Sequence, residues 1–310
     1  LLSQAEQKVF GIADARGGQS VSKLDEILHK AMDRMEARMS GEQTEDGVET
    51  HFTELDRMMG GFHANELIIL AARPSMGKTA LAMNIAENVC HLGKAPVLFI
   101  SLDMSQLELC DRLLCSAARV NGHKMRNGTI SNEDRAKLVE KAGELANSPL
   151  YVDDSPTRTV SEIASAARRI QRTHNGQIGL VVIDYLQLIE PDNNRDPRQE
   201  QVARIARRLK GLARDLKVPV LCLSQLNRQA EGSADHRPKL SHLRESGAIE
   251  QDADVVMFIH REEYYRRGED AEQFAGLAEI IIAKQRNGPV GEIEVLWQKD
   301  YTRFVDKAPE

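Results

Sequence analysis

The most informative segment of the chain reads Leu67-Ile68-Ile69-Leu70-Ala71-Ala72-Arg73-Pro74-Ser75-Met76-Gly77-Lys78-Thr79. Its first six residues are apolar and typical of a buried strand, and the residues after Thr79 are typical of a helix. The part between them fits the phosphate-binding P-loop pattern, except that Ala72 replaces the first glycine. In such a loop, backbone N–H groups and the helix N-terminus cradle phosphates, with Lys78 at the β/γ oxygens and Thr79 on Mg²⁺. We therefore predict a nucleotide site formed by Arg73, Pro74, Ser75, Met76, Gly77, Lys78 and Thr79.

Strand-like and helix-like stretches alternate through the rest of the chain. Strands are expected at 67–72, 96–102, 178–184, 218–224, 254–260, 278–283 and 292–297, and helices at 81–90, 133–145, 160–173 and 199–216. Buried apolar strands that alternate with helices predict an α/β fold whose mainly parallel sheet is flanked by helices. The last two strands are joined by a short turn at 285–290, which predicts a C-terminal β-hairpin.

Residues 1–50 differ in pattern from residues 51–310, and we expect them to form a separate linker. From Leu24 to Met39, apolar residues recur at spacings of three and four, which predicts one amphipathic helix. The polar stretch 40–47 after it has the composition of a linker. The apolar stripe packs either on its own domain or on a neighbouring subunit, and the flexible flanks favour the neighbour.

Composition restricts the classes of partner. The chain has 41 Lys and Arg against 47 Asp and Glu, a net charge of −6, which argues against a basic nucleic-acid coat. Seven Phe, five Tyr and one Trp are too few for an extended base-stacking platform. The apolar runs are strand-sized, so no membrane-spanning helix is expected. The cysteines form no C-x-x-C pair and lie in apolar stretches, which predicts buried thiols in a reducing compartment at Cys90, Cys110, Cys115 and Cys222.

Three polar residues follow predicted strands. Asp184 ends an apolar strand, the arrangement that places a carboxylate beside the Mg²⁺ of a P-loop site. Asp103 either orients water for hydrolysis or caps the helix that starts near Ser105. Gln225 either senses the γ-phosphate or bonds to the backbone as a strand-end amide.

Six segments carry a family resemblance. They are, in chain order, RPSMGKT (73–79), SLDMS (101–105), VIDYLQL (182–188), SQLNR (224–228), LRESGAIEQDAD (243–254) and AKQRNGP (283–289). Together they resemble the RecA-like P-loop NTPase motor domain of the bacterial replicative DNA helicases, the DnaB family. The resemblance covers residues 48–310. The segment before it resembles the end of the family's linker, with the helix that docks on the adjacent subunit, and the family's amino-terminal, primase-contacting domain is absent from this sequence.

The resemblance implies an ATP-dependent helicase with DNA-stimulated ATPase activity. Such a protein forms a homohexameric ring that moves 5′ to 3′ on single-stranded DNA and unwinds the duplex at the replication fork. It uses ATP and Mg²⁺, works with a primase, a helicase loader and other replisome components, and has no membrane partner. The implied location is the bacterial cytoplasm, at the nucleoid.

The resemblance also assigns roles to single residues. Lys78 and Thr79 hold phosphates and Mg²⁺, Asp184 holds the metal, Gln225 senses the γ-phosphate, and Arg112 contributes to the nucleotide site. Arg286 matches an arginine finger and Lys284 its basic companion, both reaching the neighbouring subunit's ATP; without the family, Arg286 would be a solvated turn residue that points outward. Asp103 stands where the family usually has the Glu that activates the attacking water, and Asp is one methylene shorter.

A long polar stretch at 227–251 is the expected DNA surface. Within it, the resemblance assigns DNA binding to Arg244, Glu245 and Gly247. Arg244 can contact phosphate, Gly247 leaves its backbone N–H open to a phosphate oxygen, and we expect Glu245 to position either Arg244 or a neighbour's loop. The helix 198–217 is also basic, but a charge run on an amphipathic helix is usually a solvated face. Only Arg195 and Arg198, at its start, are candidates for the channel.

Two other functions share these motifs. One is a RecA-superfamily recombinase-type ATPase or a kinase of the same superfamily. The other is a helicase accessory that binds ATP but has relaxed catalysis because of Asp103. The motif run after Leu243 and the position of Arg286 favour the helicase.

Overall fold

The computed structural model describes residues 23–39, 47–227, 236–243, 247–266 and 272–307, and the chain divides into two compact units, Leu1–Asp46 and Gly47–Glu310. Each unit is taken by itself. Within the described residues of the first unit lies one helix, α2 (Leu24–Met39). It confirms the predicted helical segment. Its apolar stripe is exposed, with Leu24, Ile27, Leu28, Met32, Met35 and Met39 between 46% and 80% accessible.

The second unit is built on one sheet, for which the described residues supply nine strands. These are β1 (Leu67–Ala72), β2 (Val97–Ser101), β3 (Leu150–Asp153), β4 (Leu180–Asp184), β5 (Val220–Gln225), β6 (Val255–His260), β7 (Leu277–Gln285), β8 (Gly291–Gln298) and β9 (Arg303–Asp306). Their order is β3-β2-β4-β5-β1-β6-β7-β8-β9. The strands from β3 to β6 pair in parallel, and β6 to β9 pair antiparallel. The predicted mainly parallel sheet and the C-terminal hairpin, β7 with β8, are confirmed.

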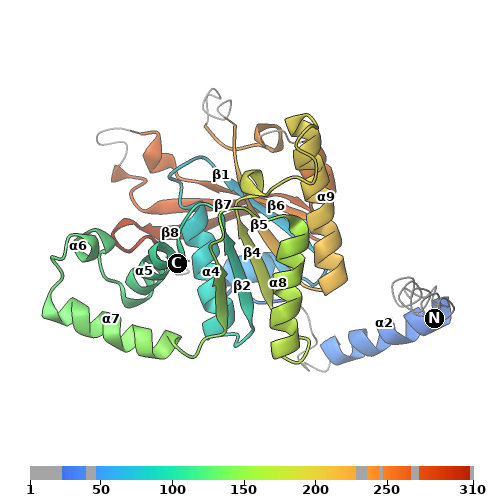
Figure 1. Ribbon diagram of the computed structural model, residues 1–310, viewed down its shortest axis with the longest axis horizontal. Coiled ribbons are helices and arrows are strands. Elements are labelled where there is room, and N and C mark those ends of the chain that lie inside the picture. The colour runs from blue at the N-terminus through green and yellow to red at the C-terminus, as the bar shows by residue number, and fades with distance from the viewer. Residues whose placement is uncertain (1–22, 40–46, 228–235, 244–246, 267–271, 308–310) are drawn as a thin grey trace, which may run out of the picture. The chain divides into compact units, whose positions relative to one another are not determined.

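Helices cover both faces of the sheet (Figure 1). The helices described in this unit are α3 (Thr53–Met59), α4 (Lys78–His91), α5 (Gln106–Ala118), α6 (Gly122–Arg126), α7 (Asn132–Leu145), α8 (Val160–Thr173), α9 (Arg198–Leu216) and α10 (Gly247–Asp252), with short 3-10 turns that include η1 (Leu186–Leu188) and η3 (Leu240–His242). Of these, α4 packs on one face of the sheet and α8 and α9 on the other, whereas α5, α6 and α7 lie beside the sheet. Three of the helices begin at Ser or Thr caps that receive a backbone N–H from the first turn, which sets where each helix starts. Those caps are Ser105, Ser131 and Thr159.

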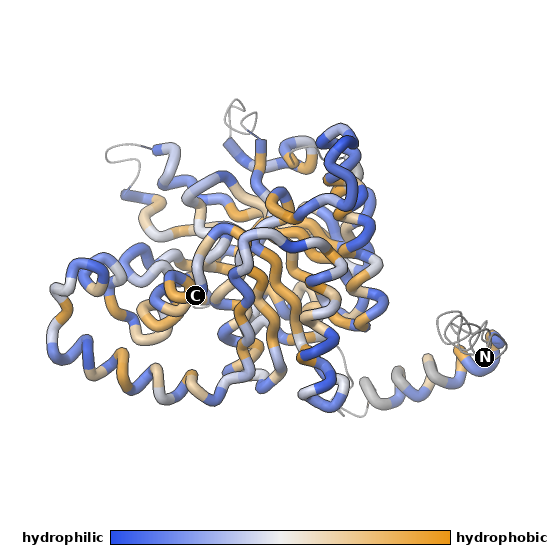
Figure 2. Tube along the Cα trace, in the orientation of Figure 1, coloured by the Kyte–Doolittle hydropathy of each residue, from blue (hydrophilic) through white to orange (hydrophobic). Residues whose placement is uncertain are grey.

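The central strands are buried on both faces, and their residues alternate between two apolar clusters. Along β1, Ile68 and Leu70 join the cluster that contains α4, whereas Leu67 and Ile69 join the cluster that contains α8 and α9. Figure 2 shows this concentration of hydrophobic residues along the strands. Both faces of β1 are apolar, so the run that defines the strand does not by itself fix its register, which is set by pairing with β5 and β6. The carboxyl ends of the parallel strands then open on one edge, where the P-loop lies.

The cysteine prediction is wrong in one position. Cys90, Cys115 and Cys222 are buried free thiols, but Cys110 is exposed. It lies on α5, directly after Leu109, the buried leucine of that helix. Successive residues of a helix point in different directions, so the apolar neighbours of Cys110 in the sequence do not surround it in space. No helix among the described residues is both long and apolar enough to cross a membrane.

Candidate functional site

The P-loop, residues 72–79, turns between β1 and α4, and all of it except Met76 lines a cavity of about 350 Å³. Met76, predicted to belong to the nucleotide site, is buried in the apolar cluster that contains α4. Gly77 is the N-cap of α4 with φ +97, a backbone conformation that L side chains rarely adopt, and Ser75 has φ +68. The first turn of α4 carries no acidic residue, so no carboxylate of the helix itself opposes the positive end of its dipole, which faces the cavity. Free backbone N–H groups at a helix N-terminus bind phosphate, and the predicted loop has this geometry.

Residues of β8 and β9 and the residue after β6 pack against the P-loop. A Cβ placed on Gly77 would lie 2.8 Å from Phe304 and 3.2 Å from Trp297, and the two rings pack with centroids 4.6 Å apart. Arg261 is buried, stacks on Trp297 at 4.7 Å and donates a hydrogen bond of 3.2 Å to the carbonyl of Ser75. The loop is thus held in place by side chains that lie far along the chain from it.

Lys78, Thr79 and Asp184 meet in the cavity. The Lys78 ammonium lies 3.8 Å from the Asp184 carboxylate, and the Thr79 hydroxyl donates a 2.6 Å hydrogen bond to its other oxygen. Burial raises the pKa of Asp184 against the opposing effect of Lys78, and burial likewise lowers the pKa of Lys78. Burial therefore makes both charges costly, and phosphate oxygens beside Lys78 would stabilise its charged form.

The side-chain oxygens of Thr79 and Asp184 show whether these residues fit the Mg²⁺ that the family resemblance implies. The Thr79 hydroxyl and the Asp184 carboxylate are hard oxygen donors side by side at the phosphate end of the cavity. Mg²⁺ prefers one or two such ligands together with substrate phosphates and waters, so these residues fit it. The described residues contain no cluster of three or more His, Cys, Asp or Glu side chains arranged to hold a metal ion.

Asp103 and Arg112 line the same cavity. Asp103 lies two residues beyond the end of β2 and is exposed. The cap of α5 is Ser105, which accepts the N–H of Glu108 in a capping box, so the alternative that Asp103 caps this helix is wrong. Arg112 projects from α5, and although burial raises the pKa of Asp184, the Arg112 charge is among those that oppose this rise.

Gln225 reaches the cavity from the next strand. It ends β5 and stands opposite Ala72 in the parallel register, so it lies directly beside the start of the P-loop. Its backbone N–H bonds to the Gln187 side chain at 3.4 Å, and Arg73 donates to the carbonyl of Leu226 at 3.2 Å. The segment after β5 is thus joined to the P-loop through both backbone and side chain.

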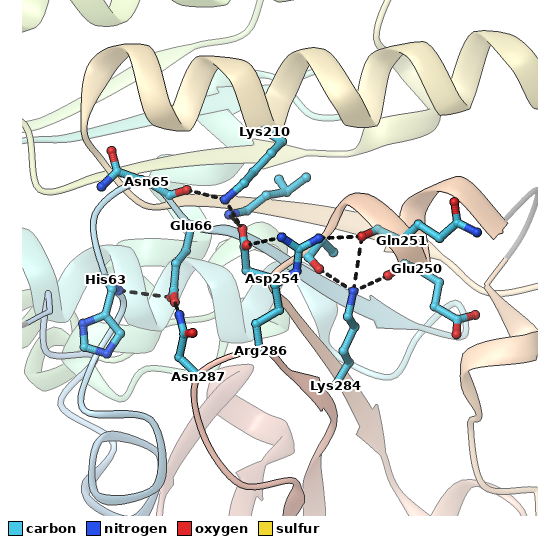
Figure 3. Close-up of polar contacts among 12 residues, drawn as sticks. His63, Asn65, Glu66, Lys210, Glu250, Gln251, Asp254, Lys284, Arg286 and Asn287 are labelled. Atoms are coloured by element: carbon cyan, nitrogen blue, oxygen red, sulfur yellow. Dashed lines mark hydrogen bonds and ion pairs between the residues drawn. The ribbon is translucent and has the colours of Figure 1, made fainter. Parts of the chain in front are cut away.

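Lys284 and Arg286 lie elsewhere, at the carbonyl end of α10 (Figure 3). Neither lines the P-loop cavity. The sequence predicts that Arg286 points outward, but its guanidinium is bound within the chain, to the Gln251 carbonyl at 2.7 Å and to Asp254 at 3.4 Å. Its side chain is nevertheless 46% exposed, and the two contacts use only part of the five N–H donors of the guanidinium.

The structure describes part of the predicted DNA surface. Gly247 is the exposed first residue of α10, whereas Arg244 and Glu245 lie outside the described residues. The Arg198 guanidinium bonds to the Gln187 carbonyl and to Gln201. Further along α9, basic side chains pair with aspartates, as expected of a solvated face: Arg204 with Asp196, Arg207 with Asp252 and Arg208 with Asp192. Lys210 instead pairs with Asp254, whose side chain is buried.

Several cavity residues were not foreseen from the sequence. The Tyr185 ring lies beneath the Lys78 ammonium at 4.6 Å, and Trp297 and Thr302 also line the cavity. Tyr185 directly follows Asp184, and Trp297 is the single tryptophan of the chain, but neither property shows which site a residue joins. The place of Trp297 and Thr302 depends on the pairing of β8 and β9 at the end of the sheet.

The chain is similar to known helicases over most of its length. Residues 47–306 match the family model described as DnaB-like helicase C terminal domain. The replicative DNA helicase DnaC of Bacillus subtilis is 43% identical over 307 residues, which are 99% of this chain and 66% of the relative. A solved structure described as an ATPase domain is 39% identical with a TM-score of 0.86, covering 93% of this chain and 100% of that domain. A DnaB-like replicative helicase, solved in a study of its interactions with primase, is 38% identical with a TM-score of 0.84, covering 99% of this chain and 72% of its own. The chain thus spans about two thirds of the length of the curated relatives it matches.

Proposed function

The chain belongs to the DnaB-like helicase C-terminal domain family, and on that premise we propose that it is the motor of an ATP-dependent replicative DNA helicase. The observation that carries the proposal is the group of Lys78, Thr79 and buried Asp184 at one cavity of about 350 Å³, with Asp103 and Arg112 on its walls. This group binds nucleoside triphosphate and hydrolyses it. Arg73, Pro74, Ser75, Met76 and Gly77 complete the phosphate loop.

Each residue has a defined task in this proposal. The P-loop N–H groups and Lys78 bind the β- and γ-phosphates, and Asp103 accepts the proton of the attacking water directly or through a second water. Thr79 and Asp184 would hold Mg²⁺, which when bound would supply positive charge beside the phosphates. Gln225 contacts the γ-phosphate and transmits its loss to the segment after β5.

The ring supplies the remaining parts. Arg286 and Lys284 lie away from their own chain's cavity, which fits action on the ATP of a neighbouring subunit. We propose a homohexamer in which residues 1–50 form the linker and α2 docks its exposed stripe on the adjacent subunit. Residues 51–310 form the motor, and Arg244, Glu245 and Gly247 contact single-stranded DNA, which passes 5′ to 3′ through the ring as the duplex unwinds. The contacts are mainly to phosphates, so binding should weaken steeply with salt.

The proposed partners follow from the family. One solved relative is described together with its interactions with primase. For this chain we propose primase, a helicase loader and other replisome components as partners, and the bacterial cytoplasm as the location.

The test is ATP hydrolysis by the assembled ring, with and without single-stranded DNA, and strand displacement on a forked duplex. Lys78→Ala should abolish both activities, because the phosphates then lose the only buried ammonium that lines the cavity in the described part of the chain. Lys137→Ala, at an exposed lysine of α7 paired with Glu133, is the matched control and should leave both unchanged. Normal unwinding by Lys78→Ala would overturn the proposal. Removal of Mg²⁺ by chelation should stop hydrolysis in the unaltered protein.

A further inference from the structure

Asp254 is the centre of a polar network at the start of β6 (Figure 3). Its side chain is 5% exposed. One carboxylate oxygen accepts the backbone N–H of Leu67 at 2.8 Å and the Lys210 ammonium at 2.7 Å, and the other faces the Arg286 guanidinium at 3.4 Å. The first oxygen therefore fixes the carboxylate to β1 and α9, and the second is left for the arginine.

The backbone around Asp254 is equally constrained. Its N–H bonds to the carbonyl of Leu67 at 2.9 Å, and its own carbonyl accepts the N–H of Arg286 at 2.9 Å. Arg286 is thus held at both its backbone and its side chain by one residue. That residue is joined to β1, the strand that leads into the P-loop of the same chain.

Two cations share the carbonyl end of α10. The Lys284 ammonium donates to the carbonyls of Glu250 and Ala253 at 2.5 and 2.7 Å, and Arg286 donates to the carbonyl of Gln251 at 2.7 Å. Burial lowers the pKa of Lys284, the neighbouring Arg286 charge lowers it further, and Asp254 opposes this. Cations are favourable at a helix C-terminus, and here the carbonyls and Asp254 together offset the repulsion between the two charges.

We propose that Asp254 is a positioning residue, which orients the Arg286 guanidinium toward the neighbouring subunit's ATP. The inference rests on the proposed function, in which Arg286 acts in trans. The ion pair and the Gln251 carbonyl use part of the guanidinium and leave the exposed part for phosphate. Without Asp254, a long side chain would sample many rotamers, and a misplacement of about 1 Å can cost on the order of 10²-fold in rate.

Helix α10 connects a proposed DNA-binding residue to Arg286. Helix α10 begins at Gly247, a proposed DNA contact, and ends at the carbonyls that bind Lys284 and Arg286. It is a single short element, so a displacement at its first residue reaches both cations through the helix backbone. DNA stimulation of hydrolysis should therefore depend on Asp254.

The experiment measures ATP turnover by rings of the full chain. Asp254→Asn should lower kcat by roughly 10- to 100-fold, with KM for ATP changed by less than about twofold, because the P-loop of the same chain is intact. Its stimulation by single-stranded DNA should fall to less than about half that of the unaltered ring, as expected if a positioned arginine carries the stimulation. The double variant Asp254→Asn/Arg286→Ala should be no slower than Arg286→Ala alone, because the two residues act as a unit.

Two controls separate positioning from loss of structure. Lys210→Met removes the other cation from the same carboxylate and should change kcat by less than about threefold, because Leu67 still holds the oxygen. Mixed rings of Asp254→Asn and Lys78→Ala subunits should hydrolyse ATP faster than rings made of either variant alone. In a mixed ring, an Asp254→Asn subunit supplies an intact P-loop, and a neighbouring Lys78→Ala subunit supplies a correctly positioned Arg286 to it. If Asp254→Asn does not assemble, Asp254→Glu keeps the charge but shifts the carboxylate by one methylene, and it should lower kcat similarly.

Unchanged kcat in Asp254→Asn or Asp254→Glu, additive losses in the double variant, equal loss in Lys210→Met, or no recovery in mixed rings would each overturn the inference. An unaltered ring without DNA-stimulated hydrolysis would instead defeat the proposed function, which distinguishes the two failures.

Discussion

Replacement of Gly77 by alanine tests the packing beneath the P-loop. The residue has φ +97, and the new Cβ would lie 2.8 Å from two carbons of the Phe304 ring, closer than real Cβ contacts allow. The left-handed backbone costs about 1–2 kcal/mol for a residue with a side chain, and overpacking a filled core costs about 1–3 kcal/mol. We therefore expect the free energy of unfolding to fall by about 2–5 kcal/mol, and Tm to fall by roughly 5–15 °C.

The matched control is Gly211→Ala on α9. The same added methyl group would meet nothing within 4 Å there, and the position is inside a helix. Alanine is favoured over glycine in a helix interior, so the free energy of unfolding of Gly211→Ala should rise by about 0.5–1 kcal/mol. The same glycine-to-alanine change is thus expected to lower the free energy of unfolding at Gly77 and to raise it at Gly211. This difference separates the effect of the local geometry from any general effect of alanine.

The assays are urea unfolding and binding of a fluorescent nucleotide. In a Phe304→Leu background the ring carbons are gone, so the steric part of the Gly77→Ala loss should shrink by about 1 kcal/mol or more while the backbone part stays. Nucleotide affinity should fall in Gly77→Ala and remain unchanged in Gly211→Ala. If Gly77→Ala unfolds at the same urea concentration as the unaltered protein and binds nucleotide equally well, the argument that the P-loop rests on Phe304 is refuted.

Three further perturbations test other parts of the site. Arg286→Ala should still form rings but lose about 10³-fold or more in turnover, as expected for an arginine supplied in trans, and unchanged turnover would contradict that role. Asp103→Asn should keep nucleotide affinity and lower kcat by about 10²- to 10⁴-fold, whereas a small loss would show that another group activates water. A thiol reagent should modify one cysteine in the native chain, Cys110, and Cys110→Ser should abolish this. Because burial raises the pKa of Cys110 above its ordinary value, with Asp111 adding to the effect, the reaction should keep accelerating as pH rises past the range in which an unperturbed thiol is already ionised.

Much of the fold was predictable because its signals are local. Each of the seven expected strands is present, and β1 and α8 have the expected bounds. Two strands were not expected, β3 and β9, which are four residues long at opposite edges of the sheet. The residues of β3 are all at least partly exposed, so no buried apolar run marks it. A short edge strand forms because it pairs with a neighbouring strand, and the residues of the edge strand alone do not show which strand that is.

The candidate site divides in the same way. The P-loop was identified from its own residues, since spacing along one segment is enough to predict how backbone N–H groups and Lys78 surround a phosphate. Whether Asp103 caps α5 could not be decided from the sequence, and only the folded helix shows that Ser105 is the cap. The role of Asp103 toward water stays a prediction.

The sequence by itself therefore determined the nucleotide-binding loop, the alternation of strands and helices, and the family. Tertiary structure alone decided what supports that loop and what holds Arg286. Phe304 and Trp297 reach Gly77 from the last strands of the chain, and Asp254 joins Arg286 to β1. Side-chain periodicity and turn signals act over a few residues, so they are visible in sequence. Contacts between segments this far apart depend on the order of strands in the sheet, and only the folded chain specifies that order.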